Sequence, residues 1–206
     1  MITIVDYGLG NIQAFANIYK RLDVPVTFAR TADDLAGSTH IILPGVGAFD
    51  WAMERLEVSG MRSTLDRLVL EDRKHILGIC VGMQMMARRS DEGSAAGLCW
   101  FDAEVKRFDE AHIQGRTHLP HMGWNDVQPL DTLGLFQDIG ADASFYFLHS
   151  YYFAPNDTTD ILAYTEYGDR FACAVQRQNI YGVQFHPEKS HGWGIQLLKN
   201  FADLKC

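Results

Sequence analysis

Short, continuous apolar runs separated by helical patterns constrain the fold of this chain more than any other feature. The runs lie in the first half, each bounded by turn residues, at 2–5, 26–29, 41–43 and 76–79. A strand that is apolar at every position is buried on both faces, which is typical of parallel sheets covered by helices. Between the runs, apolar residues recur at helical spacing over 12–22 and again over 65–69. The first half therefore predicts a doubly wound α/β sheet.

The second half has a different pattern. Segments rich in β-branched and aromatic residues, with turns between them, lie at 103–108, 145–153, 161–164, 172–176 and 181–185. We expect these to be antiparallel strands added to the sheet, closed by a helix over 193–204. No repeat and no Pro/Gly/Ser linker divides the chain, so residues 1–206 are predicted to form a single domain. The predicted fold class is α/β: an open, mostly parallel sheet with flanking helices and additional antiparallel strands in the C-terminal half.

Composition excludes several functional classes. The formal net charge is −8, from 26 acidic and 18 basic residues, which argues against a nucleic-acid-binding protein. No run of 18 apolar residues occurs, and the N-terminus lacks the basic region of a signal peptide, so neither a membrane span nor export is expected. The four cysteines have no Cys-x-x-Cys spacing and are predicted to be reduced thiols of a cytoplasmic protein.

One cysteine lies in a pattern typical of nucleophiles. The end of the run at 76–79 is followed by a predicted helix over 83–89, and the junction reads Gly78-Ile79-Cys80-Val81-Gly82. This is the Gly-x-nucleophile-x-Gly elbow with a thiol, in which bulky residues two positions away would clash with the sharp turn. A lone cysteine is more often a buried structural residue. Glycines on both sides, at a strand–helix junction, favour the nucleophile.

A thiol nucleophile needs a base and a group that orients the base. His186 ends a strand-like run, and Pro187 allows Glu188 to turn back towards its ring. Taken alone, His-Pro-Glu is more often a turn with an exposed acid, whereas together with the elbow it predicts a Cys–His–Glu triad. His149 is a second candidate for the base. The remaining histidines have no metal-ligand spacing, and no metal site is predicted.

Two glycine-rich turns also follow apolar runs. Gly45, Val46 and Gly47 come after Pro44 and offer backbone N–H groups to an oxyanion, although Pro-Gly turns are common and the signal is weak alone. The turn at 6–11 lacks the third glycine of a dinucleotide-binding loop, so no such cofactor is predicted.

Taken together, these motifs resemble the class I, triad-type glutamine amidotransferases. The resemblance is carried by GICVGMQ at 78–84, HPE at 186–188 and PGVG at 44–47. A finer resemblance, to the glutaminase subunits of imidazole glycerol phosphate synthases, is carried by DYGLGN at 6–11, LPGVGAF at 43–49, PHMGWN at 120–125, YFLHSY at 146–151, GVQFHPEKS at 182–190 and LLKNF at 197–201. The blocks occur in the order of the family and span the chain.

The resemblance implies a role for each matching residue. Cys80 attacks the carboxamide of glutamine, His186 acts as base and then acid, and Glu188 orients it. Gly45, Val46 and Gly47 supply the oxyanion hole, and Gln84, Ser150 and Tyr151 hold the amino-acid end of glutamine. The partner-facing positions are Asn11, Met122, Trp124, Tyr146 and Lys189, although spacing alone fits a core position equally well for Met and Trp. No cofactor is implied.

The resemblance further implies a partner. The glutaminase docks on a synthase (cyclase) subunit of the (β/α)8-barrel type, forms a heterodimer, and passes ammonia to it in histidine biosynthesis. An alternative keeps the hydrolysis but supplies a synthase-like amidotransferase that aminates a surface-polysaccharide (lipopolysaccharide O-antigen) sugar. Two other classes remain open: a cysteine hydrolase or chaperone-like protein of the related thiol fold, and a silent regulatory module. Release of ammonia from glutamine discriminates against the first, and the intact triad residues argue against the second.

Overall fold

The computed structural model describes residues 1–113 and 119–205, and at its centre lies an eight-stranded sheet with the strand order β2-β1-β3-β4-β13-β12-β11-β8. Its strands are β1 (Ile2–Val5), β2 (Val26–Ala29), β3 (His40–Gly45), β4 (His75–Cys80), β8 (Gln128–Pro129), β11 (Ile161–Tyr167), β12 (Asp169–Arg177) and β13 (Ile180–Val183). The pairs from β2 across to β13 are parallel, and β12, β11 and β8 are joined by antiparallel pairs. The predicted fold class is confirmed.

The central strands are buried at every residue except His75, the first residue of β4, because helices cover both faces of the sheet. Every residue of β1 and β3 is buried, whereas burial alternates along the first residues of β11. This difference is the one that the continuous apolar runs predicted. The register of β3 with β4 brings Gly45 beside Cys80. The two predicted catalytic turns therefore lie next to each other at the carboxyl ends of the central parallel strands.

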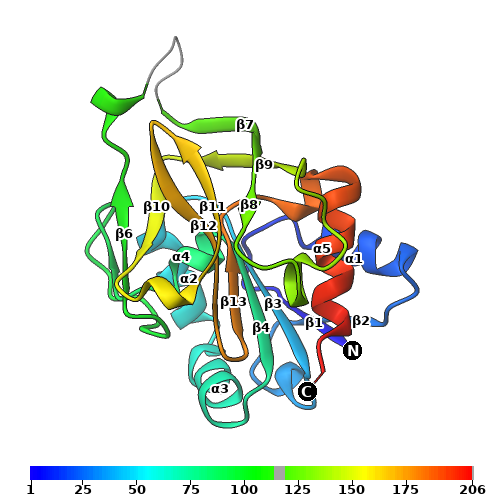
Figure 1. Ribbon diagram of the computed structural model, residues 1–206. Coiled ribbons are helices and arrows are strands. Elements are labelled where there is room, and N and C mark those ends of the chain that lie inside the picture. The colour runs from blue at the N-terminus through cyan, green and yellow to red at the C-terminus, as the bar shows by residue number, and fades with distance from the viewer. Residues whose placement is uncertain (114–118, 206) are drawn as a thin grey trace.

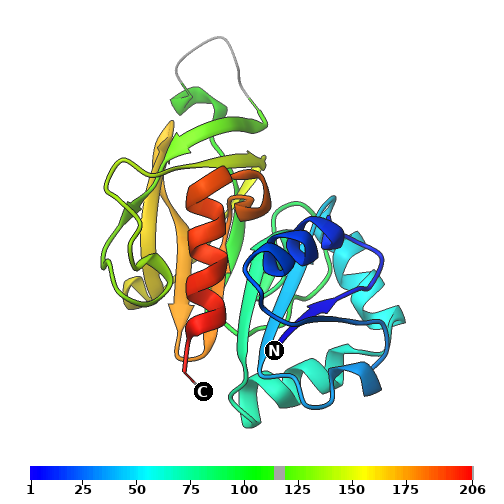
Figure 2. The same cartoon turned by 90° about the vertical axis from the view of Figure 1, so that its right-hand side faces the viewer.

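The helices lie on both sides of the central strands. Figure 1 shows α1 (Ile12–Arg21) and α5 (His191–Asp203) on one side and α2 (Phe49–Val58), α3 (Arg62–Asp66) and α4 (Val81–Gln84) on the other. Figure 2 shows α5 running along the sheet face from the end that carries β9 towards the C-terminus. Residues Arg67–Glu71 continue α3 as a π-helical turn. No described helix is long and apolar enough to cross a membrane.

Two small sheets lie outside the main one. One is three-stranded with the order β10-β6-β5, and the other pairs β7 with β9; these strands are β5 (Arg89–Ser90), β6 (Ala103–Arg107), β7 (His121–Asp126), β9 (Ser144–His149) and β10 (Tyr151–Pro155). In Figure 1 the β7–β9 pair lies across the upper end of the main-sheet strands. Short 3₁₀ turns cover Asp33–Leu35, Glu110–His112, Gly134–Phe136, Thr158–Asp160 and Pro187–Lys189.

The prediction that all late strands join the main sheet as antiparallel strands was wrong in part. The segment 145–153 is divided at Ser150, so that β9 and β10 belong to different sheets, and β6 pairs with β10. Strand β13 is antiparallel to β12 but parallel to β4. The local pattern identifies strands, but strand partners depend on which turns bring them together, and an apolar pattern carries no information about that.

The predicted helix over 83–89 was also wrong, because α4 ends after a single turn at Gln84. The next residues bond to a neighbouring segment: the N–H groups of Leu98 and Trp100 donate to the carbonyls of Met85 and Met86 at 2.7 and 3.0 Å. The Met85 and Met86 side chains are fully buried, so their apolar character reflects the core rather than one helical face. Conversely, α2 was not predicted, although Phe49, Ala52, Met53 and Leu56 form its buried face at helical spacing.

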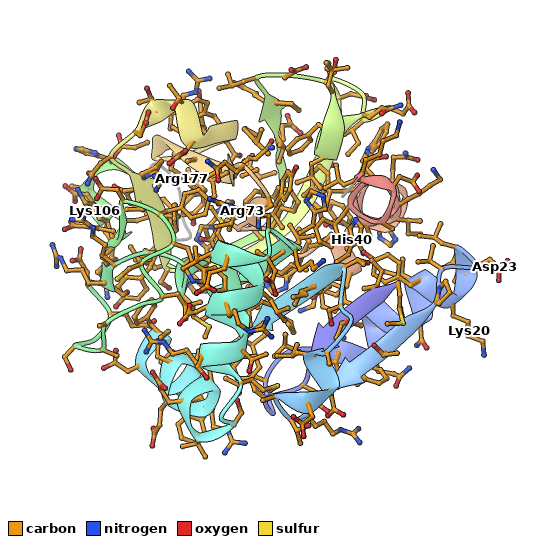
Figure 3. All side chains as sticks on the ribbon, turned by 90° about the horizontal axis from the view of Figure 1, so that it is seen from below. Lys20, Asp23, His40, Arg73, Lys106 and Arg177 are labelled. Atoms are coloured by element: carbon orange, nitrogen blue, oxygen red, sulfur yellow. The ribbon has the colours of Figure 1, made fainter. Side chains whose placement is uncertain are left out.

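The amino ends of the central strands are closed by the C-terminal segment. Nε2 of His40 donates to the carbonyl of Leu204 at 2.9 Å, and Nε2 of His75 donates to that of Lys205 at 2.9 Å. Figure 3, a view from this end, shows His40 well inside the outline of the molecule and Lys20 and Asp23 at its periphery. This end is therefore held together structurally, while the opposite end carries the candidate site.

Candidate active site

Cys80 occupies a sharply bent junction between β4 and α4. Its backbone has φ +55° and ψ −113°, a conformation that is strained in any residue except glycine. A Cβ atom at Gly78 would lie 2.6 Å from Cε of Met86. A Cβ atom at Gly82 would collide with the carbonyl oxygen of Leu43. The prediction that larger residues at these two positions would clash is confirmed, and the strained turn is held by its surroundings.

His186 and Glu188 form a buried pair beyond the end of β13. The backbone N–H of His186 donates to the carbonyl of Tyr146 at 2.8 Å, which fixes the segment to β9. Within the 3₁₀ turn that begins at Pro187, Oε1 of Glu188 comes within 2.9 Å of Nδ1 of His186, and both side chains are buried. The other carboxylate oxygen, Oε2, is buried without a hydrogen-bond partner among the described residues.

The charges around His186 determine its protonation state. Burial alone lowers the pKa of His186, but hydrogen bonds to Cys80 and Glu188, together with the negative charges of these two groups, outweigh it and raise the pKa to about 10. The imidazole is therefore protonated at neutral pH, at a position where it faces both a thiol and a carboxylate. A charged imidazole held between a thiol and a carboxylate is placed to give a proton to a leaving group.

Two glutamines that lie beside the thiol form part of the site. Nε2 of Gln184 lies 3.8 Å from Sγ of Cys80, and Nε2 of Gln84 donates to Oε1 of Gln184 at 3.0 Å and to the carbonyl of Tyr151 at 3.0 Å. Sequence reasoning singled out Gln84 but missed Gln184. The signal was present, because Gln184 is a polar residue two positions before His186, next to a continuous apolar strand.

A cavity of about 310 Å³ opens beside Cys80. Its lining includes His186, two of the three predicted oxyanion residues and all three predicted substrate-binding residues, namely Val46, Gly47, Gln84, Ser150 and Tyr151. Gly45 does not line the cavity, since it lies within the β3–β4 ladder. Glu92 also lines it and was not predicted. Its Oε2 accepts a hydrogen bond from the N–H of Phe49 at 2.8 Å, at the start of α2.

The turn after β3 is held from behind by Tyr7. The Tyr7 hydroxyl donates to the carbonyl of Pro44 at 2.6 Å, and both the ring and the hydroxyl are buried. Gly47 has φ +85°, which favours glycine because the backbone turns left-handed there. The structure thus brings the turn that follows β3, with Val46 and Gly47 lining the cavity, to the same strand end as Cys80.

Four of the five predicted partner-facing residues lie together on one surface. Met122 and Trp124 on β7 are 65% and 48% exposed, so they are surface rather than core residues. The Trp124 ring lies 6.3 Å from that of Tyr146, and Nζ of Lys189 lies 5.6 Å from the centre of the Tyr146 ring. Asn11 is exposed at the start of α1 and makes no side-chain hydrogen bond to the other four.

His149, the second candidate for the base, is not available for proton transfer. Its Nδ1 donates to the carbonyl of Tyr151 at 2.7 Å, and its Nε2 lies 3.0 Å from Nδ1 of His121. Burial, and to a lesser extent the neighbouring imidazole of His121, lower its pKa to about 3. Burial lowers the pKa of His121 to about 4. Both rings are neutral, and His186 is the histidine that the structure places with the thiol. Among residues 1–113 and 119–205 no group of three His, Cys, Asp or Glu side chains is arranged to hold a metal ion.

Comparison with known proteins identifies relatives along the whole chain. A family model described as glutamine amidotransferase class-I matches residues 3–204. The "Imidazole glycerol phosphate synthase subunit HisH" of Bdellovibrio bacteriovorus is 59% identical, covering 99% of this chain and 100% of that protein. The protein of the same name in Leptospira interrogans is 45% identical, with 99% and 100% covered.

Solved structures reproduce the fold. A crystal structure described as a glutamine amidotransferase superposes with a TM-score of 0.75 at 18% identity, covering 98% of this chain and 99% of that one. A chain from the structure of PurLQS from Thermotoga maritima has a TM-score of 0.69 at 15% identity, with 97% and 96% covered. At these identities the likeness concerns the fold alone.

Proposed function

Because the chain belongs to the class I glutamine amidotransferase family, we propose that it is the glutaminase subunit of an imidazole glycerol phosphate synthase. As a single glutaminase domain over residues 1–206, it hydrolyses glutamine to glutamate and passes the ammonia to a synthase subunit in histidine biosynthesis. The observation that carries the chemistry is the meeting of Cys80, on its strained turn, with the buried His186–Glu188 pair. The names of the relatives carry the pathway and do not favour the sugar-aminating alternative.

The first half of the reaction uses the thiolate and the imidazolium. The Cys80 thiolate attacks the carboxamide carbon of glutamine, and N–H groups of the turn from Gly45 to Gly47 stabilise the oxyanion that forms. His186 then gives its Nε2 proton to the amide nitrogen, which leaves as ammonia, and a glutamyl thioester remains on Cys80. Glu188 bonds Nδ1 of His186 throughout, so it orients the ring and stabilises its positive charge.

The second half regenerates the thiol. Neutral His186 takes a proton from water, and the water oxygen attacks the thioester carbon at the same oxyanion site. The carbon–sulfur bond breaks, the thiolate leaves with its electron pair, and glutamate is released. His186 is again an imidazolium, and the ion pair with Cys80 is restored. Both halves use the same three side chains, which is why the proposed triad has no further acid or base.

Substrate recognition follows from the lining of the cavity. We assign the amino-acid end of glutamine to Gln84, Ser150 and Tyr151, whose polar groups line the cavity on the α4 and β9–β10 side. Glu92 adds a carboxylate to the same cavity, and its negative charge complements the α-ammonium group of the substrate. Since Gln84 uses both hydrogens of its Nε2 on Tyr151 and Gln184, its oxygen Oε1 is the atom that we assign to the substrate.

The exposed surface around β7 is the proposed docking face for the synthase subunit. Met122 and Trp124 are large exposed apolar residues, and Lys189 adds a cation beside Tyr146; such residues are typical interface anchors. We propose a partner of the (β/α)8-barrel type and assign Asn11 to the rim of the same face. The reaction belongs in the cytoplasm, where Cys80 stays reduced.

The experiment that tests this proposal measures glutamate release from glutamine by the purified chain. It is carried out with the chain alone and with an imidazole glycerol phosphate synthase cyclase subunit loaded with its nucleotide substrate. Strong stimulation of glutamate release by the loaded partner is expected. Cys80→Ala should lower turnover by a factor on the order of 10⁴ or more while leaving the complex intact.

Other outcomes separate the alternatives. Turnover that survives in Cys80→Ala would overturn the assignment of the nucleophile. Glutaminase activity without any response to the cyclase would move the acceptor to another synthase. No release of glutamate even with the loaded partner would favour a hydrolase of other specificity, and binding that stimulates the cyclase without hydrolysis would favour a silent module.

A further inference from the structure

A continuous line of hydrogen-bonded polar groups, buried except for the partly exposed Tyr151 and Asn125, leads away from Cys80 and continues beyond the proposed substrate-binding residues. We call it the buried network. From the thiol outwards it consists of Gln184, Gln84, the Tyr151 carbonyl, His149, His121 and Asn125. It ends on β7, the strand whose outer face carries Met122 and Trp124.

The inner half of the buried network holds the substrate side of the pocket. Nε2 of Gln184 faces Sγ of Cys80 at 3.8 Å, and its Oε1 accepts from Gln84 at 3.0 Å. Gln84 in turn donates to the Tyr151 carbonyl at 3.0 Å. The side chains of Gln84 and Gln184 are almost completely buried. Their amide groups therefore depend on these partners, because a buried polar group without a partner costs more than a hydrogen bond gains.

The outer half reaches the Tyr151 carbonyl from the other direction. Nδ1 of His149 donates to it at 2.7 Å, and Nε2 of His149 lies 3.0 Å from Nδ1 of His121. Nε2 of His121 lies 3.2 Å from Nδ2 of Asn125. Asn125 is itself fixed, since Nδ2 also donates to the carbonyl of Glu166 at 2.7 Å and Oδ1 accepts from the N–H of Asp126 at 2.9 Å.

These partners leave one assignment of protons. The Tyr151 carbonyl accepts only, so Nδ1 of His149 carries the hydrogen and Nε2 carries a lone pair. Nδ1 of His121 must then donate to that lone pair, which makes Nε2 of His121 an acceptor. Asn125 supplies the donor that Nε2 requires. All donors from Asn125 to Tyr151 point the same way, and both histidines are neutral Nδ1–H tautomers.

The surroundings agree with neutral rings. His121 is stacked between Phe147 and Tyr167, with ring centroids 4.7 and 4.1 Å away and interplanar angles of 20° and 19°. His121 and His149 are 3% and 7% exposed. No carboxylate bonds to either ring among the described residues, and the pKa values of both are lowered by burial. An isolated buried histidine is commonly a packing residue, but packing alone does not require that the four groups from Asn125 to Tyr151 donate in one direction.

Strand β7 carries the outer residues of the buried network on one face and exposed apolar residues on the other. Burial alternates along β7, so that His121 and Asn125 face inwards while Met122 and Trp124 are exposed. A displacement of β7 relative to β9 moves Nδ1 of His121 away from Nε2 of His149 and leaves a buried nitrogen without its partner. The adjustment is passed to the Tyr151 carbonyl and hence to Gln84. Rigid, fully paired polar networks hold one arrangement in this way.

We propose that the buried network is a positioning device: His121 and His149, as fixed Nδ1–H tautomers, tie the strand that carries the exposed Met122 and Trp124 to the groups that hold glutamine beside Cys80. The part of this proposal that concerns glutamine binding rests on the proposed function. The hydrogen-bond arrangement itself does not depend on that function. His121, His149 and Asn125 are positioning residues, because they act through Tyr151 and Gln84 and not on the reacting atoms.

The tautomers are the first test. Long-range ¹H–¹⁵N correlation spectra of the full chain, labelled in its histidine rings and recorded at pH 7 without ligand, report which nitrogen carries the hydrogen. Both His121 and His149 are expected as neutral Nδ1–H tautomers, the less common form of free histidine. The exposed His112, whose Nδ1 faces Asp169 at 2.6 Å, serves as a reference. An Nε2–H tautomer or an imidazolium in either buried ring would overturn the proposal.

The second test reverses the polarity at the outer end. Asn125→Asp replaces the donor to Nε2 of His121 by an acceptor, so His121 is forced to take up a proton there. We expect the ring spectrum of His121 to change to that of an imidazolium and the KM for glutamine to rise about three- to thirtyfold, with a smaller change in kcat. The control is Asn17→Asp on α1, where the side chain already acts as an acceptor from Gln13.

A double variant identifies the route. If Asn125 acts through Gln84, combining Asn125→Asp with Gln84→Ala should raise KM little beyond Gln84→Ala alone, whereas Asn17→Asp should leave the effect of Gln84→Ala unchanged. Fully additive effects in a folded double variant would overturn the route. Where Asn125→Asp does not fold, His121→Phe keeps the ring between Phe147 and Tyr167 and removes the hydrogen bonds, and it should raise KM in the same range.

The two proposals fail in different ways. If the wild-type chain releases no glutamate, the proposed function fails, while the tautomers and the rate of Cys80 alkylation by iodoacetamide still test the network. Asn125→Asp should change the rate of Cys80 alkylation about threefold or more, since Gln84 and Gln184 connect the outer part of the network to Cys80. An unchanged alkylation rate and an unchanged KM in the folded variant would contradict the network even where glutaminase activity is present.

Discussion

Two regions beside Cys80 hold buried histidines in opposite states. In the first, which follows β13, His186 lies 2.9 Å from the carboxylate of Glu188, and its pKa is raised to about 10. In the second region, between β7 and β9, His121 and His149 contact each other. Their other neighbours are aromatic rings and the carbonyl of Tyr151. The pKa values of His121 and His149 are lowered to about 4 and 3. All three side chains are less than a tenth exposed.

Equal burial therefore does not decide the charge of a histidine; its partner does. Desolvation penalises the imidazolium in both regions, and only a neighbouring anion reverses it. The difference assigns the roles. The charged ring beside the thiol has the property required for the proton transfer that we propose for His186, whereas two neutral rings with both nitrogens bonded fit the positioning role that we propose for His121 and His149. The following predictions test whether this division is real, beginning with the largest effect.

Replacement of one histidine from each region should separate the roles most clearly. Asparagine at position 186 keeps a donor near Glu188 but transfers no proton, so His186→Asn should lower kcat by a factor on the order of 10³–10⁴. His149→Asn keeps the donor to the Tyr151 carbonyl and should cost about tenfold or less. The measurement is partner-stimulated glutamate release. Losses of similar size in the two variants would erase the distinction between the regions.

The pH dependence of stability should have opposite signs in the two regions. The folded pKa values of His121 and His149 lie below the ordinary 6.5, so the stability they contribute is present above pH 6.5 and lost as the pH falls towards 4. His186 has a raised pKa, so its contribution is present below pH 6.5 and lost as the pH rises towards 10.

Urea unfolding at a series of pH values measures these slopes. The control is the double variant His121→Phe/His149→Phe. Between pH 6.5 and 4 the free energy of unfolding of the wild type should fall by roughly 2 to 5 kcal/mol more than that of this variant. The difference between the two proteins cancels the carboxylates, which titrate in both. Parallel curves would mean that the two buried rings accept protons in the folded state and that the second region is not neutral.

Glu188→Gln should make His186 resemble the second region. The amide still accepts a hydrogen bond from Nδ1 of His186, but the negative charge is lost, so the pKa of His186 should fall and its positive form should be stabilised less. We expect a loss of about 10- to 100-fold in kcat, milder than for His186→Asn because orientation is partly kept. Ring ¹⁵N titration and the pH profile of kcat check this. Wild-type activity in the variant would exclude Glu188 from the site.

The contact between His186 and Glu188 in the first region could be predicted from the sequence because the two residues are neighbours along the chain. His186, Pro187 and Glu188 form one turn, and glycines at fixed distances flank Cys80, so local spacing was sufficient. The central strands were equally accessible, since continuous apolar runs specify burial on both faces. Even the short helix after Cys80 could not be given its correct length, because Met85 and Met86 bond to a segment more than ten residues away.

The second region could not be predicted for the same physical reason. His121 and His149 meet only because β7 pairs with β9 in a register that places them opposite each other, and register depends on turns that a local pattern does not specify. Gln184 and Glu92 were missed because a single polar residue beside an apolar run has no spacing that marks it. A local pattern does not specify the pairing of distant segments, and the contacts of Gln184, Gln84 and His121 in the buried network depend on such pairing.

Lys189 lies where the two regions meet, and it provides the smallest predicted effect. It follows Glu188 directly, and its Nζ lies 5.6 Å from the centre of the Tyr146 ring, which is opposite Trp124 in the β7–β9 ladder. Such a cation–π contact contributes about 0.5 to 1 kcal/mol at an exposed site. Lys189→Ala should therefore lower, about two- to fivefold, the turnover that the loaded synthase partner stimulates.

The comparison is sharpened by measuring alkylation of Cys80 in the isolated chain with the same variant. Because we assign Lys189 to the proposed docking face and not to the His186–Glu188 pair beside the thiol, the alkylation rate should change less than the stimulated turnover. Lys199→Ala is the matched control, since Lys199 is an exposed lysine on α5 paired with Asp203, and it should change neither quantity. If alkylation falls as much as stimulated turnover, Lys189 acts on the charged region directly and the two regions are not joined through it.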